Sequence, residues 1–142
     1  YKSLSSQRSK ATRDVLLDPF CGTATLLIEA GMIAKNIAPG LYREFCSEEW
    51  PLIAKKIWTD TRLEAKDEIR EDVDYKIYGS DISGHALTIA RENLEKAGLD
   101  NIFVQTLPLK EMNSRFNYGK IVTNPPYGER LSEKTDRSGK RA

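Results

Sequence analysis

A stretch near the start of the chain limits the fold most, because its hydrophobic pattern changes from one type to another within a few residues. Residues 15–17 form a short apolar run that stops at Asp18-Pro19, which is typical of a buried strand of a parallel sheet. After a tight turn, apolar residues recur every three or four positions, which predicts a helix over 25–36. A strand, a turn and a helix are the first half of a βαβ unit.

The same alternation continues along the chain. A second strand is expected over 76–81, and Ser83 can cap a following helix that ends at Gly98. Further strands are expected over 102–105 and 120–123. The fold class predicted is α/β, a Rossmann-like open parallel sheet that is truncated after its fourth strand. Ligands of such sheets bind at the carboxyl edge, where the strand order reverses.

The domain organisation follows from these patterns. Residues 1–14 are polar and basic without periodicity, so we expect a flexible N-terminal segment. Residues 15–131 form one domain, interrupted over 41–72 by a charged and aromatic insertion with a helix over 51–69. The polar residues 132–142 are expected to form a loose tail.

Composition restricts the function. Lys and Arg total 22 and Asp and Glu 21, so the basic excess of a stand-alone nucleic-acid binder is missing. Cys21 and Cys46 are far apart, and His85 is the single histidine, which argues against a disulfide framework or a metal site and favours reduced cytoplasmic thiols. His85 is expected on a helix surface. No apolar run approaches the roughly 20 residues of a membrane helix, and no signal peptide is recognisable.

The turn after the first strand is a possible ligand site. Gly22 lets the backbone turn sharply and lets a ligand approach closely, and the helix beyond it offers unpaired N–H groups. The sequence is neither a Walker loop nor GxGxxG. Asp18 at the strand end disfavours bare phosphate and favours a ligand with a cationic amine, such as the aminoacyl end of S-adenosylmethionine. An ordinary strand-to-helix turn remains the alternative.

Asp81 closes the second strand. An acid at this position of a nucleotide-binding sheet accepts hydrogen bonds from ribose hydroxyls. The insertion places it later than the usual spacing of roughly 20 residues after the glycine loop. A plain helix-capping role is the alternative reading.

The four residues Asn124, Pro125, Pro126 and Tyr127 follow the last apolar strand directly. Two prolines hold the backbone extended and remove N–H donors. The Asn124 amide oxygen and the Pro125 carbonyl can then accept hydrogen bonds from one –NH2 group and aim its lone pair at a methyl sulfonium. Tyr127 can stack on the flat face of a base. This arrangement predicts methylation of an amino group.

These motifs carry a family resemblance. DPFCGTATLLIEA, NIAPGLYREFCSEEW, GSDISGHALTIARENLEKAGL and IVTNPPYGERL together resemble the THUMP-associated bacterial 23S rRNA guanine-N2 methyltransferases, over most of residues 17–131. The resemblance implies S-adenosylmethionine as cofactor, ribosomal RNA as substrate, and direct in-line methyl transfer without a covalent enzyme intermediate. By this resemblance, the methionine part of the cofactor would be held by Asp18, Gly22 and Thr23. The ribose would be held by Asp81, the adenine would pack on Ile82, and the target base would be held by Asn124 to Tyr127.

The chain departs from this family in three respects. The family normally has glycine where this chain has Ala24, and the added methyl is expected to crowd the cofactor if that residue needs positive φ. No acid follows the third strand to meet the adenine amine, so Gln105 or a backbone group must substitute. The last three strands of the family's sheet and the RNA-binding THUMP domain are also absent, which indicates a fragment.

Three other readings stay open. A related amino methyltransferase acting on DNA adenine or a protein glutamine amide would share the NPPY motif, although the GER that follows it and the insertion favour the rRNA family. An inactive cofactor-binding fragment of the full enzyme is the second. A dehydrogenase is the third, and the absent GxGxxG counts against it.

Overall fold

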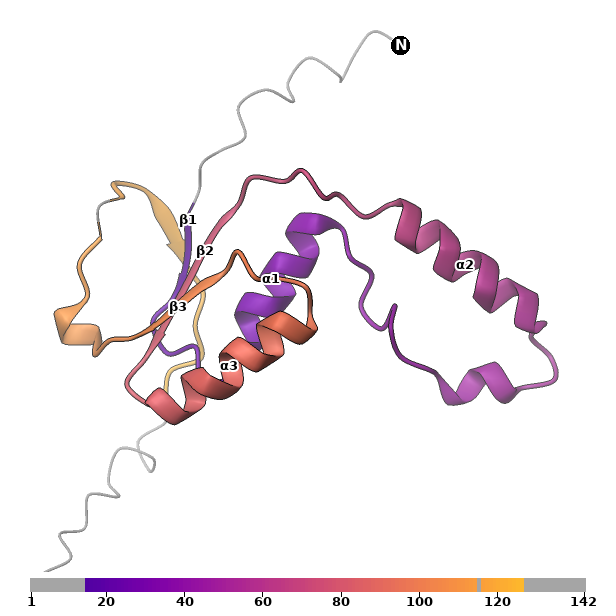
Figure 1. Ribbon diagram of the computed structural model, residues 1–142, viewed down its shortest axis with the longest axis horizontal. Coiled ribbons are helices and arrows are strands. Elements are labelled where there is room, and N and C mark those ends of the chain that lie inside the picture. Colours follow the sequence, from indigo (N-terminus) through magenta and orange to yellow (C-terminus); the bar gives the residue numbers. More distant parts are fainter. Residues whose placement is uncertain (1–14, 115, 127–142) are drawn as a thin grey trace, which may run out of the picture.

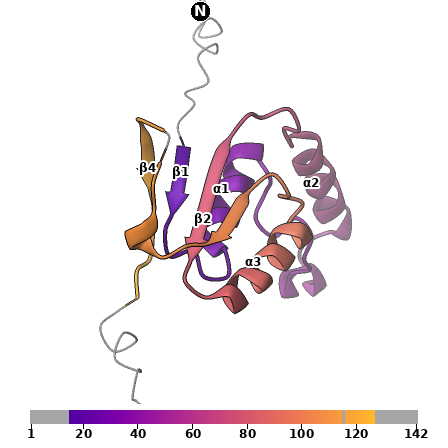
Figure 2. The same ribbon diagram turned by 60° about the vertical axis from the view of Figure 1, so that its left-hand side comes forward.

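A computed structural model describes residues 15–114 and 116–126 of the chain. Its sheet has four parallel strands, and their order is β3-β2-β1-β4 (Figure 2). The strands are β1 (Val15–Asp18), β2 (Lys76–Asp81), β3 (Phe103–Thr106) and β4 (Gly119–Ile121). The chain moves outward from β1 to β3 and then returns to the other side of β1. The predicted α/β parallel sheet is confirmed, and the strand order reverses between β1 and β4.

Two helices cover one face of the sheet. Helices α1 (Thr25–Lys35) and α3 (Gly84–Lys96) lie side by side there (Figure 1). Apolar side chains from both helices and from the inner face of the strands fill the space between them, so the core is a single layer between helices and sheet. It comprises Cys21, Ala24, Leu27, Ile77, Leu87, Ala90, Leu94, Leu99, Ile102 and Val104.

The ends of these helices follow local chemistry. The hydroxyl oxygen of Ser83 accepts the backbone N–H of Ala86 at 3.2 Å, so the predicted cap of α3 is confirmed. Gly98 has φ 66° just beyond α3, as a C-terminal glycine does. Helix α1 ends at Lys35, and its C-cap residue Asn36 adopts the left-handed region with φ 57°. His85 is exposed on α3, as expected.

The insertion between α1 and β2 extends away from the sheet (Figure 1). It contains a short 3-10 helix, η2 (Cys46–Glu49), and the helix α2 (Lys55–Asp67). Arg62 on α2 forms an ion pair with Glu48, with Nη1 to Oε2 at 2.9 Å, and this partner lowers the pKa of Glu48 to about 2. The rings of Phe45 and Trp58 stack with centroids 5.9 Å apart. The insertion therefore has its own polar and aromatic contacts.

The two ends of the insertion meet at the C-terminus of α1. The backbone N–H of Arg70 donates to the Lys35 carbonyl at 2.8 Å. The Asn36 side-chain amide donates to the carbonyl of Glu68 at 3.0 Å, and Lys35 Nζ lies 3.2 Å from Glu71 Oε2. The insertion is thus fastened at its base.

Three boundaries differ from the prediction. Helix α2 begins at Lys55 and not at 51, because Ala54 is extended (φ −62°, ψ 131°). Strand β3 begins and ends one residue later than expected. Strand β4 covers Gly119–Ile121, although the Val122 N–H still donates to the Leu17 carbonyl at 3.1 Å. The short helix η3 (Leu109–Glu111) was not foreseen.

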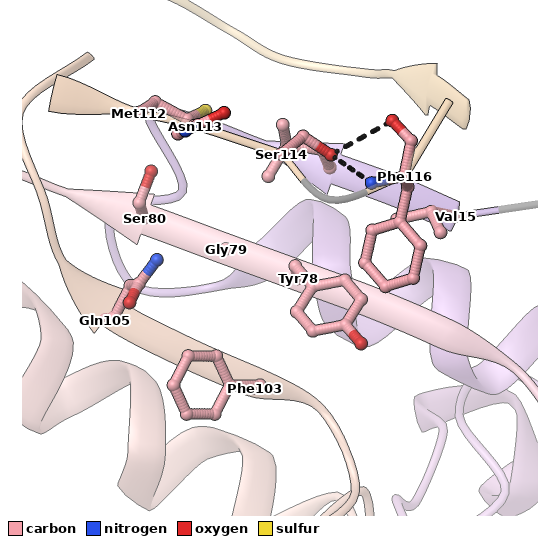
Figure 3. A pocket seen from close by; sticks show the side chains of 11 residues that line it. Val15, Tyr78, Gly79, Ser80, Phe103, Gln105, Met112, Asn113, Ser114 and Phe116 are labelled. Carbon is pink, nitrogen blue, oxygen red and sulfur yellow. Dashed lines mark hydrogen bonds between the residues drawn. The ribbon is translucent and has the colours of Figure 1, made fainter. Parts of the chain in front are cut away.

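The face of the sheet opposite α1 and α3 is covered by no α-helix among the described residues (Figure 2). Side chains of β1, β2 and β3 and of the segment before β4 line a hollow of about 450 Å³ there (Figure 3). Tyr78 packs on Phe103 and Phe116, at ring-centroid distances of 6.3 and 5.6 Å.

No helix within the described ranges is long and apolar enough to cross a membrane. The segments predicted over 1–14 and 132–142 lie outside the described residues.

Candidate functional site

The turn between β1 and α1 is open on one side. Gly22 has φ 52°, and a Cβ added there would meet no atom of the described residues within 4 Å. The N-cap residue of α1, Ala24, has φ 72°, and its side chain makes no capping hydrogen bond. The first N–H groups of α1 therefore lack the side-chain acceptor that often satisfies them. A ligand above the turn can approach the backbone closely.

Ala24 has the positive φ that the sequence analysis considered. It is fully buried and belongs to the core, so its methyl lies on the core side of the turn and not on the open side. The expected crowding of the cofactor by this methyl is not supported by its position. What remains is the backbone strain of a non-glycine residue in the left-handed region.

Asp81 connects the turn to the end of β2. Its Oδ2 accepts the backbone N–H of Gly22 at 2.9 Å, and its Oδ1 accepts the N–H of Ser83 at 2.9 Å. The N–H of Cys21 also donates to the Ser80 carbonyl at 2.9 Å. At Gly79 an added Cβ would lie 2.4 Å from a methyl of Leu27. Only glycine permits this close approach of β2 to α1.

Asp18 lies beneath the turn. Its side chain is almost fully buried, at 1% exposure. Its Oδ1 accepts the backbone N–H of Phe20 at 3.1 Å and the hydroxyl of Thr123 at 2.6 Å. A buried carboxylate needs such donors. The carboxylate therefore links the turn after β1 to the segment after β4.

Two further residues predicted for the site lie near this turn. Thr23 is exposed, and its carbonyl accepts the side-chain amide of Asn93 on α3 at 3.1 Å. Ile82 follows β2 directly and is 76% exposed. The structure thus gathers Asp18, Gly22, Thr23, Asp81 and Ile82 at one edge of the sheet.

Gln105 lies elsewhere. It lines the hollow on the helix-free face, together with Ser80 (Figure 3). The next residue, Thr106, pairs in register with Asp81, and the N–H of Leu107 donates to the Asp81 carbonyl at 3.0 Å. Sequence reasoning did not single out Thr106. The alternation of side chains along a strand is the signal that points to it, because Val104 is in the core and Thr106 shares its face.

The residues Asn124, Pro125 and Pro126 are exposed and follow Thr123 directly. Because Thr123 is bonded to Asp18, they begin one residue from the carboxylate under the turn. The carboxyl ends of β1 and β4 are neighbours in the sheet. Tyr127, the last residue of the motif, lies outside the described residues.

Cys21 sits in the turn but is a poor nucleophile. Burial, with the nearby charges of Asp18 and Asp81, raises the pKa of its thiol from 9.0 to about 12. Thiols react as thiolates, so this one stays protonated and inert near neutral pH. Within the described part of the chain, no cluster of three His, Cys, Asp or Glu side chains is arranged to hold a metal ion.

Together these groups suit a nucleotide-like ligand. Free lone pairs of the Asp81 carboxylate, the backbone of the turn and the apolar side chain of Ile82 lie along one edge of the sheet. The turn itself follows β1, beside which the strand order reverses, and open α/β sheets bind ligands at such a place.

Known proteins are similar to this chain in sequence and in fold. YpsC of Bacillus subtilis (strain 168), named provisionally as an RNA methyltransferase, is 46% identical over 119 residues, which are 83% of this chain and 31% of YpsC. The ribosomal RNA large subunit methyltransferase K/L of Legionella pneumophila (strain Corby) is 43% identical over 122 residues, 84% of this chain and 17% of that protein. The chain therefore spans a third or less of these relatives.

Solved structures of two proteins are also similar to this chain. The crystal structure of SMU.472 complexed with SAH superposes with a TM-score of 0.79 at 38% identity, over 85% of this chain and 32% of SMU.472. A chain from Listeria monocytogenes str. 4b F2365, described as a predicted N6-adenine-specific DNA methylase, gives a TM-score of 0.78 at 43% identity, over 85% of this chain and 32% of its own length.

A family model described as "RMKL-like, methyltransferase domain" matches residues 5–139. This match includes the turn after β1, the insertion and the NPPY segment. With relatives and solved structures pointing the same way, the chain belongs to the RMKL-like methyltransferase-domain family.

Proposed function

We propose that the protein containing this chain transfers a methyl group from S-adenosylmethionine to an exocyclic amino group of a nucleic-acid base, namely N2 of a guanine in 23S rRNA. One observation supports this most. The open turn after β1 is bonded to Asp81 on one side and, through Asp18 and Thr123, to the start of Asn124-Pro125 on the other. In this proposal the turn is the cofactor site and the segment that starts at Asn124 binds the amine, so the two would meet at one edge of the sheet.

The described residues fit the cofactor. A carboxylate has about four lone-pair sites, and Gly22 and Ser83 use two of those on Asp81, which leaves acceptors for ribose hydroxyls. The open space above Gly22 accommodates the methionine part of the cofactor beside Thr23 and the N-terminus of α1. Asp18 is buried, so in this proposal it acts through the turn that it holds.

The adenine would pack on Ile82, which is exposed beside Asp81. The sequence left two candidates for the adenine amine, Gln105 or a backbone group. Gln105 lines the opposite face of the sheet, so its use would require the ligand to reach around the end of β3. The Thr106 hydroxyl and the backbone after it are better placed, since Thr106 is in register with Asp81.

The bound cofactor supplies an electrophilic methyl on a sulfonium. The protein's task is to hold the target amine in line with that methyl. The Asn124 amide oxygen and the Pro125 carbonyl would accept hydrogen bonds from the two N–H groups of the amine and stabilise the positive charge that develops on nitrogen. The methylated nitrogen would then lose one proton to solvent. Tyr127 would stack on the base. Most of the rate enhancement in this mechanism comes from positioning, and no side chain of the protein needs to act as a nucleophile.

The net charge of the chain and the names of its relatives both bear on the class of substrate. The chain has a formal net charge of +1, so it offers little phosphate affinity of its own. We propose that an RNA-binding THUMP domain elsewhere in the full-length protein supplies it. The names of the K/L relatives favour ribosomal RNA. N6-adenine methylation of DNA is the second candidate, favoured by the name of the Listeria neighbour.

The full-length protein tests this proposal directly. Tritiated methyl transfer would be measured side by side on rRNA, on DNA and on a release-factor protein. We expect transfer to rRNA alone, and mass spectrometry of 23S rRNA from a strain lacking the gene should show the loss of one N2-methylguanosine. Transfer to DNA adenine would replace the proposed substrate with the second candidate. Absence of transfer to all three would reject the proposed activity.

A further inference from the structure

We propose that Thr123 is a positioning residue for methyl transfer: its hydroxyl, bonded to buried Asp18, sets the position of the amine-binding segment relative to the cofactor turn. This inference rests on the proposed function. It concerns a residue that precedes the NPPY motif and that touches neither cofactor nor substrate in the proposed mechanism.

The contact joins two parts of the site that are far apart in sequence. Thr123 Oγ1 donates to Asp18 Oδ1 at 2.6 Å across 105 residues. The same carboxylate oxygen accepts the Phe20 N–H at 3.1 Å, inside the cofactor turn. One buried oxygen thus receives a donor from each half of the site.

The Thr123 hydroxyl fixes a part of the chain that backbone pairing between β4 and β1 does not reach. Backbone pairing aligns β4 with β1 as far as Val122, whose N–H donates to Leu17. Beyond that point the chain leaves the sheet, and its next residues are Thr123 and Asn124. Pro125 and Pro126 have no N–H groups, so they cannot continue the ladder. The Thr123 hydroxyl therefore extends the connection between the strands by one residue, up to the amine-binding segment.

The burial of Asp18 makes this contact specific. The carboxylate is 1% exposed, so water is a poor substitute for a lost donor. Replacing Thr123 with valine preserves the shape of the side chain but removes the donor. We expect Asn124 and Pro125 then to shift relative to the turn, and displacements of about 1 Å at a reacting pair cost on the order of a hundredfold in rate.

The test uses the full-length protein and its single-turnover rate with saturating cofactor and rRNA. Thr123→Val should lower this rate by about tenfold to a hundredfold, while the Kd for S-adenosylhomocysteine measured by calorimetry stays within about threefold. Thr123→Ser retains the hydroxyl and should recover most of the rate. Thr61→Val, at an exposed position of α2, is the matched control and should behave as the wild type.

The possible results distinguish a failure of the positioning role of Thr123 from a failure of the proposed function. A Thr123→Val protein with an unchanged single-turnover rate would overturn the positioning role, and so would a Thr123→Ser protein as slow as the valine variant. A purely structural role would reduce the fraction of cofactor-binding protein, counted by calorimetric stoichiometry, without changing the rate per bound site. A wild-type protein with no transfer would reject the proposed function, and the inference with it.

Discussion

Gly22 donates its backbone N–H to Asp81 Oδ2 at 2.9 Å, across 59 residues of sequence. This bond brings the glycine turn and the acid at the end of β2 into one site despite the insertion between them. It also orients the Asp81 carboxylate before any ligand arrives. An acceptor fixed in this way loses little conformational freedom on binding.

The ribose role proposed for Asp81 leads to the first prediction. Asp81→Ala should weaken binding of S-adenosylhomocysteine about a hundredfold or more, because two hydrogen bonds to a charged acceptor are lost at about 1.5–3 kcal/mol each. Calorimetry on the full-length protein measures this. Asp100→Ala, at an exposed turn position, is the control. Equal affinities in the two variants would contradict the assignment.

A second prediction concerns Ala24. Ala24→Gly relieves left-handed strain of about 1–2 kcal/mol, but it removes a buried methyl worth about 0.8 kcal/mol and adds about 0.4–1 kcal/mol of unfolded-state entropy. The free energy of unfolding should therefore change by less than about 1 kcal/mol. Because the methyl lies in the core, the Kd for the cofactor should change less than about twofold. Markedly tighter binding by the glycine variant would restore the crowding hypothesis.

The third prediction tests the chemistry at Asn124. In the full-length protein, Asn124→Ala should reduce the methylation rate by roughly 10²–10³, the scale observed when one preorganised electrostatic partner is removed. Cofactor affinity should barely change, since this residue is proposed to face the target base. The matched variant is Asn117→Ala, at an exposed position before β4, which should keep its activity. A stably folded and fully active Asn124→Ala protein would rule out the amine-binding role.

The fourth prediction uses the thiols. At pH 8, Cys46 is exposed and should react with a disulfide reagent, whereas buried Cys21 should react only after unfolding. The pKa of Cys21 is raised from 9.0 to about 12 in the folded state. The stability associated with its neutral form is therefore present below pH 9 and lost as the pH rises from 9 to 12.

Denaturation curves measured between pH 8 and pH 11 check this dependence. Cys21→Ala should remove that part of the pH dependence, because the alanine variant lacks the titrating group. Two thiols reacting at equal rates in the folded protein would contradict the burial of Cys21.

The sequence predicts the sheet and its helices well, since each element has a clear boundary signal. Strand β2 lies at its predicted residues, and Ser83 and Gly98 bound α3 as expected. The helix of the insertion was predicted too long because apolar residues before it (51–54) and residues after it, including Glu68, fit a helical pattern. Its start depends on the extended backbone at Ala54, which no residue preference in that segment requires.

The site was only partly predictable for two physical reasons. Gln105 and Thr106 lie on opposite faces of β3, because side chains alternate along a strand, and which face packs against the helices is set by the tertiary fold. The bond between Thr123 and Asp18 depends on which strands are neighbours. That adjacency is a property of the whole sheet, and no local pattern around either residue contains it.

The joined ends of the insertion have a consequence for how this domain tolerates change. Arg70 is hydrogen-bonded to Lys35, and Glu68 to Asn36. The residues between these pairs therefore form a loop whose two ends are held together at the C-terminus of α1. We expect changes in the length of the insertion to leave the distance from Gly22 to Asp81 unchanged. The insertion is therefore a place where the sequence can vary without altering the proposed cofactor site.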